Sequence, residues 1–256
     1  MVRLIRRSIA LFIHLLLGLI LAFGYRVRHG SAWYNTQSGS TMTLWWMQRF
    51  AAIIGLKVRV AGTLRPDTVL LTANHVSWID IVAIATFYPA NFVAKSSVQS
   101  WPLIGTISSL GGTLFVHRDG SKEKLKNSIA NITDVLRRGR SVVVFPEGTT
   151  TDGKSVGHFH NALFQPAIDA GCPIQPMVIC YTREGELDTI APFIGDDTFI
   201  AHLLRIFRTD ETEVTLTLRP AIPVEGKTRS ELTNLCQKSI GETLQSYLAN
   251  QRGDDF

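Results

Sequence analysis

Two apolar segments with helical character lie near the start of the chain. Residues 8–24 are almost uninterrupted in their apolar character and have arginines on both sides. As a helix this segment would be about 25 Å long, slightly less than the roughly 30 Å hydrocarbon core of a bilayer. In residues 41–54, apolar side chains recur at helical spacing beside Trp45 and Trp46, a combination typical of membrane interfaces. The pattern predicts an apolar membrane-binding helix over 8–24 and an amphipathic one over 41–54.

Each segment also has a second interpretation. A secretory signal peptide would share the basic start of the first segment, with Ala22 to Gly24 as a small-x-small cleavage site. The second segment is too short to cross a bilayer and would also suit an ordinary helix packed against a protein core. Both alternatives stay open at this stage.

From residue 56 onward, short β-rich runs alternate with helical ones, which favours an α/β fold. No internal repeat, low-complexity tract or linker divides this part of the chain. We predict an anchor over residues 1–55 and a single domain over residues 56–256, with a mostly parallel central sheet flanked by helices. Residues 183–212 do not follow the alternation and are expected to be irregular, covering the site or touching the membrane. Strands are predicted at 57–61, 69–73, 92–94, 114–117, 141–145, 174–180 and 214–220, and helices at 79–87, 103–110, 121–138, 161–170 and 230–252.

The composition of the chain is consistent with contact with lipid. Of the 256 residues, 45% are apolar and 18% are charged, below the roughly 25% charged residues of typical soluble domains. A formal charge of +5 attracts anionic headgroups, phosphorylated small molecules or nucleic acid, and charge alone does not choose among them. Because the basic residues are scattered and no nucleic-acid fingerprint is present, we expect no nucleic-acid partner.

The cysteines indicate packing rather than chemistry. Cys172, Cys180 and Cys236 are widely spaced in apolar or helical sequence, as expected of reduced residues in a cytosolic domain. His158 and His160 near Cys172 provide part of a zinc ligand set, but two ligands without a matching pair often arise by chance. We expect neither a metal nor a cofactor.

A histidine and an aspartate interrupt the apolar stretch 72–82. His75 follows a predicted strand and Asp80 lies at the start of a predicted helix. Polar residues at the carboxyl end of a strand commonly face the binding crevice of an α/β sheet. A neutral imidazole there can act as a general base if a carboxylate fixes its tautomer. Helix capping is the alternative role, and the spacing alone does not decide between them.

Three further segments carry polar groups at the ends of predicted strands. Residues 141–150 form a buried-strand run that breaks at Pro146 into a hydroxyl-rich turn, which suits the presentation of backbone N–H groups to an anion. Residues 111–118 place Arg118 where a guanidinium can bind phosphate in bidentate fashion, with a surface salt bridge as the alternative. Residues 172–178 form another apolar strand, opened by prolines.

These four segments, in this order and at these intervals, resemble the glycerophospholipid acyltransferases, in particular the bacterial type of 1-acyl-sn-glycerol-3-phosphate (lysophosphatidic acid) acyltransferase. Residues Asn74–Asp80 are similar to the catalytic block of this family, with its HX4D motif, and Gly112–Arg118 to its second block. Phe145–Thr149 is similar to the third block and Pro173–Val178 to the fourth. The resemblance covers residues 56–220, and the N-terminal segments are similar in kind to the membrane elements of the family.

The resemblance implies direct acyl transfer. His75, oriented by Asp80, would take the proton from the sn-2 hydroxyl of 1-acyl-sn-glycerol-3-phosphate. The oxygen would attack an acyl thioester of coenzyme A or acyl carrier protein and give phosphatidic acid. The chain has no Gly-x-Ser-x-Gly elbow, so Ser77 is expected in a supporting role, with a covalent role as the alternative.

The resemblance also implies residues that bind the acceptor. Arg118 would hold its phosphate, and Glu147, Gly148 and Thr149 would shape the glycerol and phosphate pocket. Lys95, at the end of a predicted strand, is a candidate second cation, with a solvated surface position as its alternative.

Two departures from the family pattern concern the acceptor. Thr150 stands where the family usually has arginine, and Phe159–Ala162 stands where the family has Phe-Lys-x-Gly. Both changes remove positive charge near the expected phosphate pocket. They leave room for a phosphorus-free lysolipid such as lyso-ornithine lipid as an alternative acceptor.

The location of the protein follows from its expected substrates. If residues 8–24 crossed the membrane once from the cytoplasm, the rest of the chain would lie away from cytosolic acyl donors. We therefore favour monotopic or hairpin-like attachment through membrane lipids, at the cytoplasmic face of the inner membrane. A lipid or thioester hydrolase and a non-catalytic lipid-binding membrane protein are the alternative functions.

Overall fold

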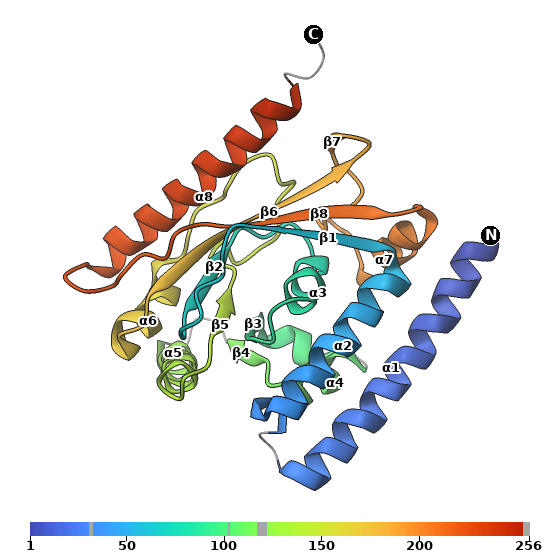
Figure 1. Ribbon diagram of the computed structural model, residues 1–256, viewed down its shortest axis with the longest axis horizontal. Coiled ribbons are helices and arrows are strands. Elements are labelled where there is room, and N and C mark those ends of the chain that lie inside the picture. Colours follow the sequence, from blue (N-terminus) through green and yellow to red (C-terminus); the bar gives the residue numbers. More distant parts are fainter. Residues whose placement is uncertain (31–32, 102, 117–121, 253–256) are drawn as a thin grey trace.

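A mostly parallel β-sheet lies at the centre of the protein, as seen in the computed structural model (Figure 1). The structure describes residues 1–30, 33–101, 103–116 and 122–252. Within these ranges, eight strands form one sheet: β1 Leu56–Ala61, β2 Leu70–Ala73, β3 Asn91–Lys95, β4 Leu114–Val116, β5 Val142–Val144, β6 Ile174–Arg183, β7 Glu186–Leu187 and β8 Thr212–Leu218.

The strands follow the order β1-β8-β6-β2-β5-β3-β4, and β7 pairs with β6. Strand β6 runs antiparallel to β7 and β8, whereas the other pairings are parallel. The predicted α/β fold with a mostly parallel central sheet is thereby confirmed. The seven predicted strands correspond to β1–β6 and β8, although their ends differ by up to three residues and His117 lies outside the described residues.

Helices cover both faces of the sheet. One core cluster joins the sheet to α2, α3 and α7, and a second joins it to α5, α6 and α8 (Figure 1). Successive side chains of a central strand point to opposite faces of the sheet. Leu71 therefore packs in the first cluster and Leu70 in the second. The helices are α1 Val2–His29, α2 Gln37–Ile54, α3 Ile79–Ala85, α4 Ile104–Leu110, α5 Lys122–Arg137, α6 Gln165–Ala170, α7 Phe199–Arg208 and α8 Arg229–Arg252, with short 3-10 turns η1 Trp33–Asn35, η2 Ser96–Ser100 and η3 Asn161–Phe164.

The central strands direct their carboxyl ends to one edge of the sheet. Strands β2, β3 and β5 are mutually parallel, and β6 is parallel to β2. The loops that follow β2 and β5 therefore meet at the same edge, where α/β proteins commonly bind ligands. His75 lies in the first of these loops and Glu147 in the second.

Helix α1 packs against the helices that follow it in the chain. It contacts α2, α4 and α7, and Gly18 lies so close to α2 that a β-carbon there would meet the Trp46 ring at 2.7 Å. The Arg7 guanidinium donates to the carbonyl oxygens of Thr209 and Asp210, both at 2.8 Å. By length and composition alone, α1 could cross a membrane. Among the described residues, it is the helix with this property. The division between anchor and catalytic domain at residue 55 stays a prediction.

The irregular structure expected over residues 183–212 is only partly observed. Helix α7 lies within this segment, begins after Thr198 and buries one side against the core. The Thr198 hydroxyl accepts a hydrogen bond from the amide of Ala201, which stabilises the start of the helix. Proline and glycine just before Thr198 hid this short amphipathic helix in the sequence. The expectation was therefore wrong for α7.

Candidate active site

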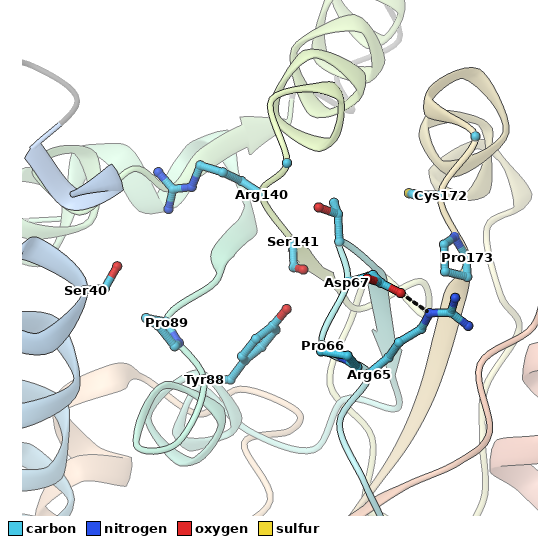
Figure 2. A pocket seen from close by; sticks show the side chains of 13 residues that line it. Ser40, Arg65, Pro66, Asp67, Tyr88, Pro89, Arg140, Ser141, Cys172 and Pro173 are labelled. Carbon is cyan, nitrogen blue, oxygen red and sulfur yellow. Dashed lines mark hydrogen bonds and ion pairs between the residues drawn. The ribbon is translucent and has the colours of Figure 1, made fainter. Parts of the chain in front are cut away.

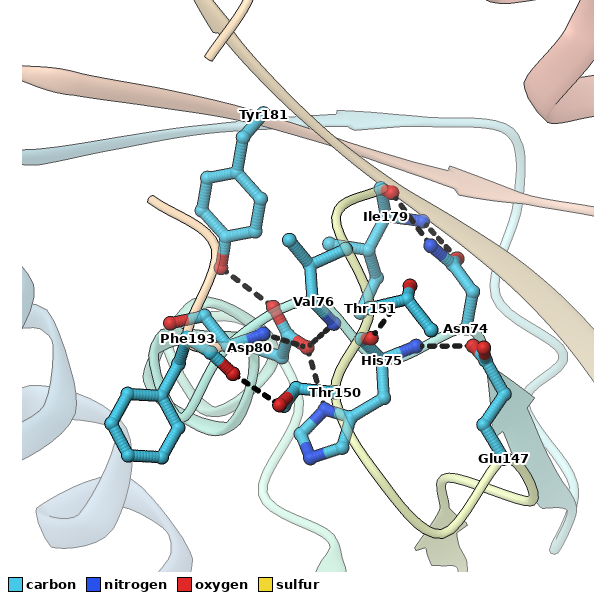
Figure 3. Close-up of polar contacts among 11 residues, drawn as sticks. Asn74, His75, Val76, Asp80, Glu147, Thr150, Thr151, Ile179, Tyr181 and Phe193 are labelled. Atoms are coloured by element: carbon cyan, nitrogen blue, oxygen red, sulfur yellow. Dashed lines mark hydrogen bonds and ion pairs between the residues drawn. The ribbon is translucent and has the colours of Figure 1, made fainter. Parts of the chain in front are cut away.

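His75 and Asp80 lie side by side at the carboxyl edge of the sheet (Figure 3). The Nδ1–H group of His75 donates to Asp80 Oδ2 over 2.7 Å. The Asp80 side chain is fully buried, and the His75 side chain is 18% exposed. This geometry fixes the tautomer of a neutral imidazole and directs Nε2 away from the carboxylate. The spacing that was ambiguous in the sequence thus forms a hydrogen-bonded pair in the structure.

Residues in and just after the third sequence block fix the backbone and ring of His75. Its amide donates to Glu147 Oε1 over 2.8 Å, and its carbonyl oxygen accepts from the amide of Thr151 over 2.8 Å. The Phe145 ring stacks on the imidazole with centroids 4.1 Å apart. These contacts restrict both the position and the orientation of the histidine.

Asn74 fixes the end of β2 against β6. Its side-chain amide donates to the carbonyl oxygen of Ile179 over 2.9 Å, and its side-chain oxygen accepts from the amide of Ile179 over 2.8 Å. The buried side chain therefore replaces a backbone rung between the two strands, one residue before His75.

Asp80 accepts hydrogen bonds at both carboxylate oxygens. Besides His75, Oδ2 accepts from the amides of Val76 at 2.8 Å and Ser77 at 3.0 Å. The other oxygen, Oδ1, accepts from the hydroxyl of Tyr181 at 2.7 Å. Tyr181 lies on β6, about one hundred residues further along the chain, and was not anticipated. All residues of this strand except the last are buried, so no alternation in the sequence singled out Tyr181.

Ser77 contacts Asp80 through its backbone, and its hydroxyl is enclosed by the protein. Its side chain is fully buried, and its Oγ has no hydrogen-bond partner among the described residues. The support that it gives to Asp80 comes from its backbone amide.

Glu147 is nearly buried beneath the loop that holds His75. Its second oxygen accepts from the amide of Gly157 over 2.8 Å, so both carboxylate oxygens accept backbone N–H groups. Burial raises the pKa of the Glu147 carboxyl, although the hydrogen bonds from His75 and Gly157 oppose this effect. Its predicted part in the acceptor pocket stays a prediction.

The turn after Glu147 continues into a connection with the segment before α7. Gly148 adopts a positive φ of 71°, which favours glycine, and both Gly148 and Thr149 are exposed. The Thr150 hydroxyl donates to the carbonyl oxygen of Phe193, and the amide of Phe193 donates to the carbonyl oxygen of Val76 over 2.9 Å. The residue that departs from the family pattern therefore joins two segments beside the histidine (Figure 3).

His202 provides a second polar contact that the sequence did not reveal. The Trp78 indole N–H donates to His202 Nδ1 over 2.9 Å, and His202 Nε2–H donates to the carbonyl oxygen of Ala191 over 3.1 Å. Desolvation by burial lowers the pKa of His202, and nearby Arg205 lowers it further. A neutral histidine therefore holds Trp78, two residues before Asp80, against α7.

The two predicted cations are not both located. Lys95 ends β3 at the same edge of the sheet and is exposed. Arg118 lies outside the described residues, so its predicted contact with the acceptor stays a prediction.

A cavity of about 690 Å³ lies at the opposite end of the strands (Figure 2). Residues before β2, β5 and β6 line it, including Arg65 and Arg140. Arg65 pairs with Asp67 at 3.1 Å, and the Arg140 guanidinium lies over the Tyr34 ring, 4.9 Å from its centroid. The Nη1 atom of Arg140 is buried without a hydrogen-bond partner among the described residues, but no second group of the cavity points to a particular ligand, and we assign none.

Comparison with known proteins identifies the family. Residues 56–180 match the family described as Acyltransferase. The chain is 40% identical over 199 residues to a lyso-ornithine lipid O-acyltransferase of Pseudomonas aeruginosa, covering 78% of this chain and 76% of that protein. It is 33% identical over 198 residues to a 1-acyl-sn-glycerol-3-phosphate acyltransferase of Neisseria meningitidis serogroup B, covering 77% and 76% of the two chains.

A solved structure agrees in fold. The crystal structure of the 1-acyl-sn-glycerophosphate acyltransferase PlsC from Thermotoga maritima superposes with a TM-score of 0.70 at 16% identity, covering 96% of this chain and 94% of that chain. Taken with the sequence relatives, the chain belongs to the glycerophospholipid acyltransferase family and is an acyltransferase of the lysophospholipid type.

Proposed function

We propose that the protein transfers a fatty acyl group from a thioester to the hydroxyl of a lysolipid, with His75 as general base. The observation that carries this proposal is the 2.7 Å hydrogen bond between His75 Nδ1 and the buried carboxylate of Asp80. Nε2 would take the proton of the acceptor hydroxyl as its oxygen attacks the acyl carbonyl carbon. The negative charge of Asp80 would stabilise the imidazolium that forms.

The thioester then breaks without an acyl-enzyme. As the tetrahedral intermediate collapses, the carbon–sulfur bond cleaves, and the proton held by His75 passes to the departing thiolate. Acyl-coenzyme A and acyl carrier protein both supply this chemistry as donors. The buried position of Ser77 supports direct transfer, because an internal nucleophile must be reached by the acyl donor.

We propose lyso-ornithine lipid as the acceptor. The relative that is 40% identical is named as a lyso-ornithine lipid O-acyltransferase. At position 150, where the family usually has arginine, this chain has the neutral residue Thr150, whose hydroxyl donates to the carbonyl oxygen of Phe193. An acceptor without phosphate requires less fixed positive charge at this position.

The second candidate acceptor is 1-acyl-sn-glycerol-3-phosphate, acylated at its sn-2 hydroxyl to phosphatidic acid. It is favoured by the four ordered sequence blocks and by the relative from Neisseria meningitidis. In this case Arg118 and Lys95 would contact the phosphate, and Glu147, Gly148 and Thr149 would shape the pocket around the glycerol.

We further propose monotopic attachment at the cytoplasmic face of the inner membrane. Helix α1 packs against α2, α4 and α7 of its own chain, which is compatible with a helix lying in the membrane interface. Its outer side exposes large apolar residues such as Phe12 and Ile20. This surface would bring the lysolipid in its membrane close to the catalytic edge.

An acceptor panel tests the proposed function. The purified protein is incubated with a labelled acyl thioester and lyso-ornithine lipid, 1-acyl-sn-glycerol-3-phosphate or no acceptor. We expect labelled diacyl product with lyso-ornithine lipid and at least ~1,000-fold less with His75→Ala. Undiminished activity in His75→Ala would refute the role of the dyad, and preference for the phosphate acceptor would replace the first acceptor by the second. Thioester cleavage without any acceptor would indicate a hydrolase.

A further inference from the structure

Tyr181 and Asp80 meet in the interior of the protein, behind the histidine. The phenolic hydroxyl donates to Asp80 Oδ1 over 2.7 Å, and both side chains are almost completely buried (Figure 3). We propose that Tyr181 is a positioning residue for acyl transfer, which fixes the Asp80 carboxylate and through it the orientation of His75. This proposal rests on the catalytic role proposed for the dyad.

The local segment satisfies only one oxygen of the carboxylate. Oδ2 accepts from His75 Nδ1 and from the amides of Val76 and Ser77, all within five residues of Asp80. At the other oxygen, the donor among the described residues comes from the sheet, as the hydroxyl of Tyr181. An unpaired carboxylate oxygen at a fully buried position is strongly disfavoured, so this hydroxyl completes the set of hydrogen bonds that orients the carboxylate.

The position of the phenol is itself fixed. Tyr181 lies within β6 and pairs with Val214 in the antiparallel ladder. Asn74 joins the end of β2 to the same strand at Ile179, two residues before Tyr181. The strand that supplies the hydroxyl is thus hydrogen-bonded directly to the residue before His75.

Tyr181 stays a donor throughout the working range of the site. Burial and then the charge of Asp80 raise the pKa of the phenol well above its usual value, so it remains protonated. Other charged groups around the pair, within the described residues, are Glu147 at the His75 amide and Asp188, which pairs with Arg183 at 2.8 Å. These groups are unchanged by removal of the hydroxyl.

The hydroxyl acts on the reaction through the position of Asp80. Without it, Oδ1 would be left unpaired in the interior, and the carboxylate could tilt within the three hydrogen bonds that remain at Oδ2. A displaced carboxylate would hold the His75 imidazole less well in line with the acceptor hydroxyl, which reduces the rate of proton transfer and leaves substrate binding unchanged.

The test is the variant Tyr181→Phe, assayed as the full chain with the acceptor that the panel identifies. We expect kcat to fall by ~10- to 100-fold and KM to stay within about twofold. The loss should therefore appear in kcat and not in KM, as expected of a residue that acts on the His75–Asp80 pair and not on substrate binding. Tyr88→Phe is the matched control, because it removes a half-buried hydroxyl beside Ser141 at the opposite end of the sheet (Figure 2).

A double-mutant cycle separates positioning from general destabilisation. In the Asp80→Asn background, Tyr181→Phe should change the residual kcat by less than about twofold, because the hydroxyl acts through Asp80. An unchanged kcat in Tyr181→Phe would overturn the inference. Equal losses from Tyr181→Phe in the wild-type and Asp80→Asn backgrounds would also overturn it. If His75→Ala retains activity, the proposed function fails first, and the two failures are thus distinguishable.

Discussion

Glu147 accepts a hydrogen bond from the backbone amide of His75, although the two residues belong to sequence blocks 72 residues apart. The same carboxylate accepts from the amide of Gly157. The position of the histidine is therefore set by the third block as well as by its own loop. A residue expected to shape the substrate pocket therefore has contacts that hold His75 in place.

The first prediction concerns Glu147→Gln. Because burial raises the pKa of Glu147 in the folded protein, ionisation of this group reduces stability as the pH rises above about 4.3, the value for an unfolded glutamate. Glutamine does not ionise, so the difference in Tm between variant and wild type should grow in favour of the variant between pH 4 and 7. Activity should nevertheless fall by at least ~10-fold, because one backbone N–H group loses its acceptor and His75 shifts.

Glu231→Gln is the control for this comparison. Hydrogen bonds from Thr228 lower the pKa of Glu231, so its contribution to stability is present above the unfolded value and is lost at low pH. The Tm difference should therefore change with pH in the opposite direction, with activity unaffected. A parallel pH dependence in the two variants would contradict the assignment for Glu147.

The second prediction concerns His202, which must stay neutral to accept from Trp78. Desolvation lowers its pKa in the folded state, so its contribution to stability is present above about pH 6.5 and is lost as the pH falls below that value. His202→Gln retains one acceptor and one donor. Its unfolding free energy should fall less steeply from pH 6.5 to 5 than that of the wild type, by at most ~1.4 kcal/mol per pH unit. Thermal denaturation over this range provides the measurement, with exposed His158→Gln as control.

Residues of the site could be predicted from the sequence where a reactive side chain interrupts a clear local pattern. His75 and Asp80 stand out because they are polar groups at the junction of an apolar strand and helix, and the sheet could be deduced from alternating runs. Tyr181 could not be found, because its strand is buried on both faces and a buried aromatic residue is ordinarily part of the core. Its hydroxyl reaches Asp80 only because the fold brings α3 next to β6, and these two segments are distant along the chain.

The third prediction concerns acceptor choice at Thr150. Replacement by arginine restores the charge of the family pattern and removes the hydrogen bond to Phe193. The ratio of kcat/KM for 1-acyl-sn-glycerol-3-phosphate over lyso-ornithine lipid should rise by at least ~10-fold, because a guanidinium contact with phosphate is a charge-assisted hydrogen bond. Thr150→Val removes the hydroxyl without adding charge and should leave this ratio within about threefold. Equal ratios in the two variants would exclude a charge effect.

The fourth prediction separates the two sides of α1. Phe12 and Ile20 are 57% and 69% exposed, whereas Leu11 is buried. Replacing both exposed residues by serine should weaken binding to anionic lipid vesicles by at least ~10-fold with little change in Tm, since each apolar side chain contributes about 1.5–3 kcal/mol when fully buried. Leu11→Ala should instead lower stability by ~2–5 kcal/mol and leave vesicle binding almost unchanged. Loss of vesicle binding in Leu11→Ala alone would argue against this orientation.

Helix α7 illustrates a limit of the sequence pattern. A helix of ten residues is recognised poorly when prolines and glycines precede it, and its buried side is defined by the segments that it contacts. His202 takes its role from Trp78 and Ala191, neither of which is adjacent in sequence. The polar contacts of Trp78 therefore depend on α7, which lies in a segment where the sequence predicted no regular element.

The contacts of Arg7 have a practical consequence for preparing the enzyme. This guanidinium donates to carbonyl oxygens at the end of α7, the same helix that carries His202. Trimming the first 55 residues to gain solubility would leave those carbonyls without their donor and uncover the apolar surfaces beneath α1 and α2. A shortened protein would thus be prone to aggregation, and detergent or lipid nanodiscs with the full chain are the better route to active material.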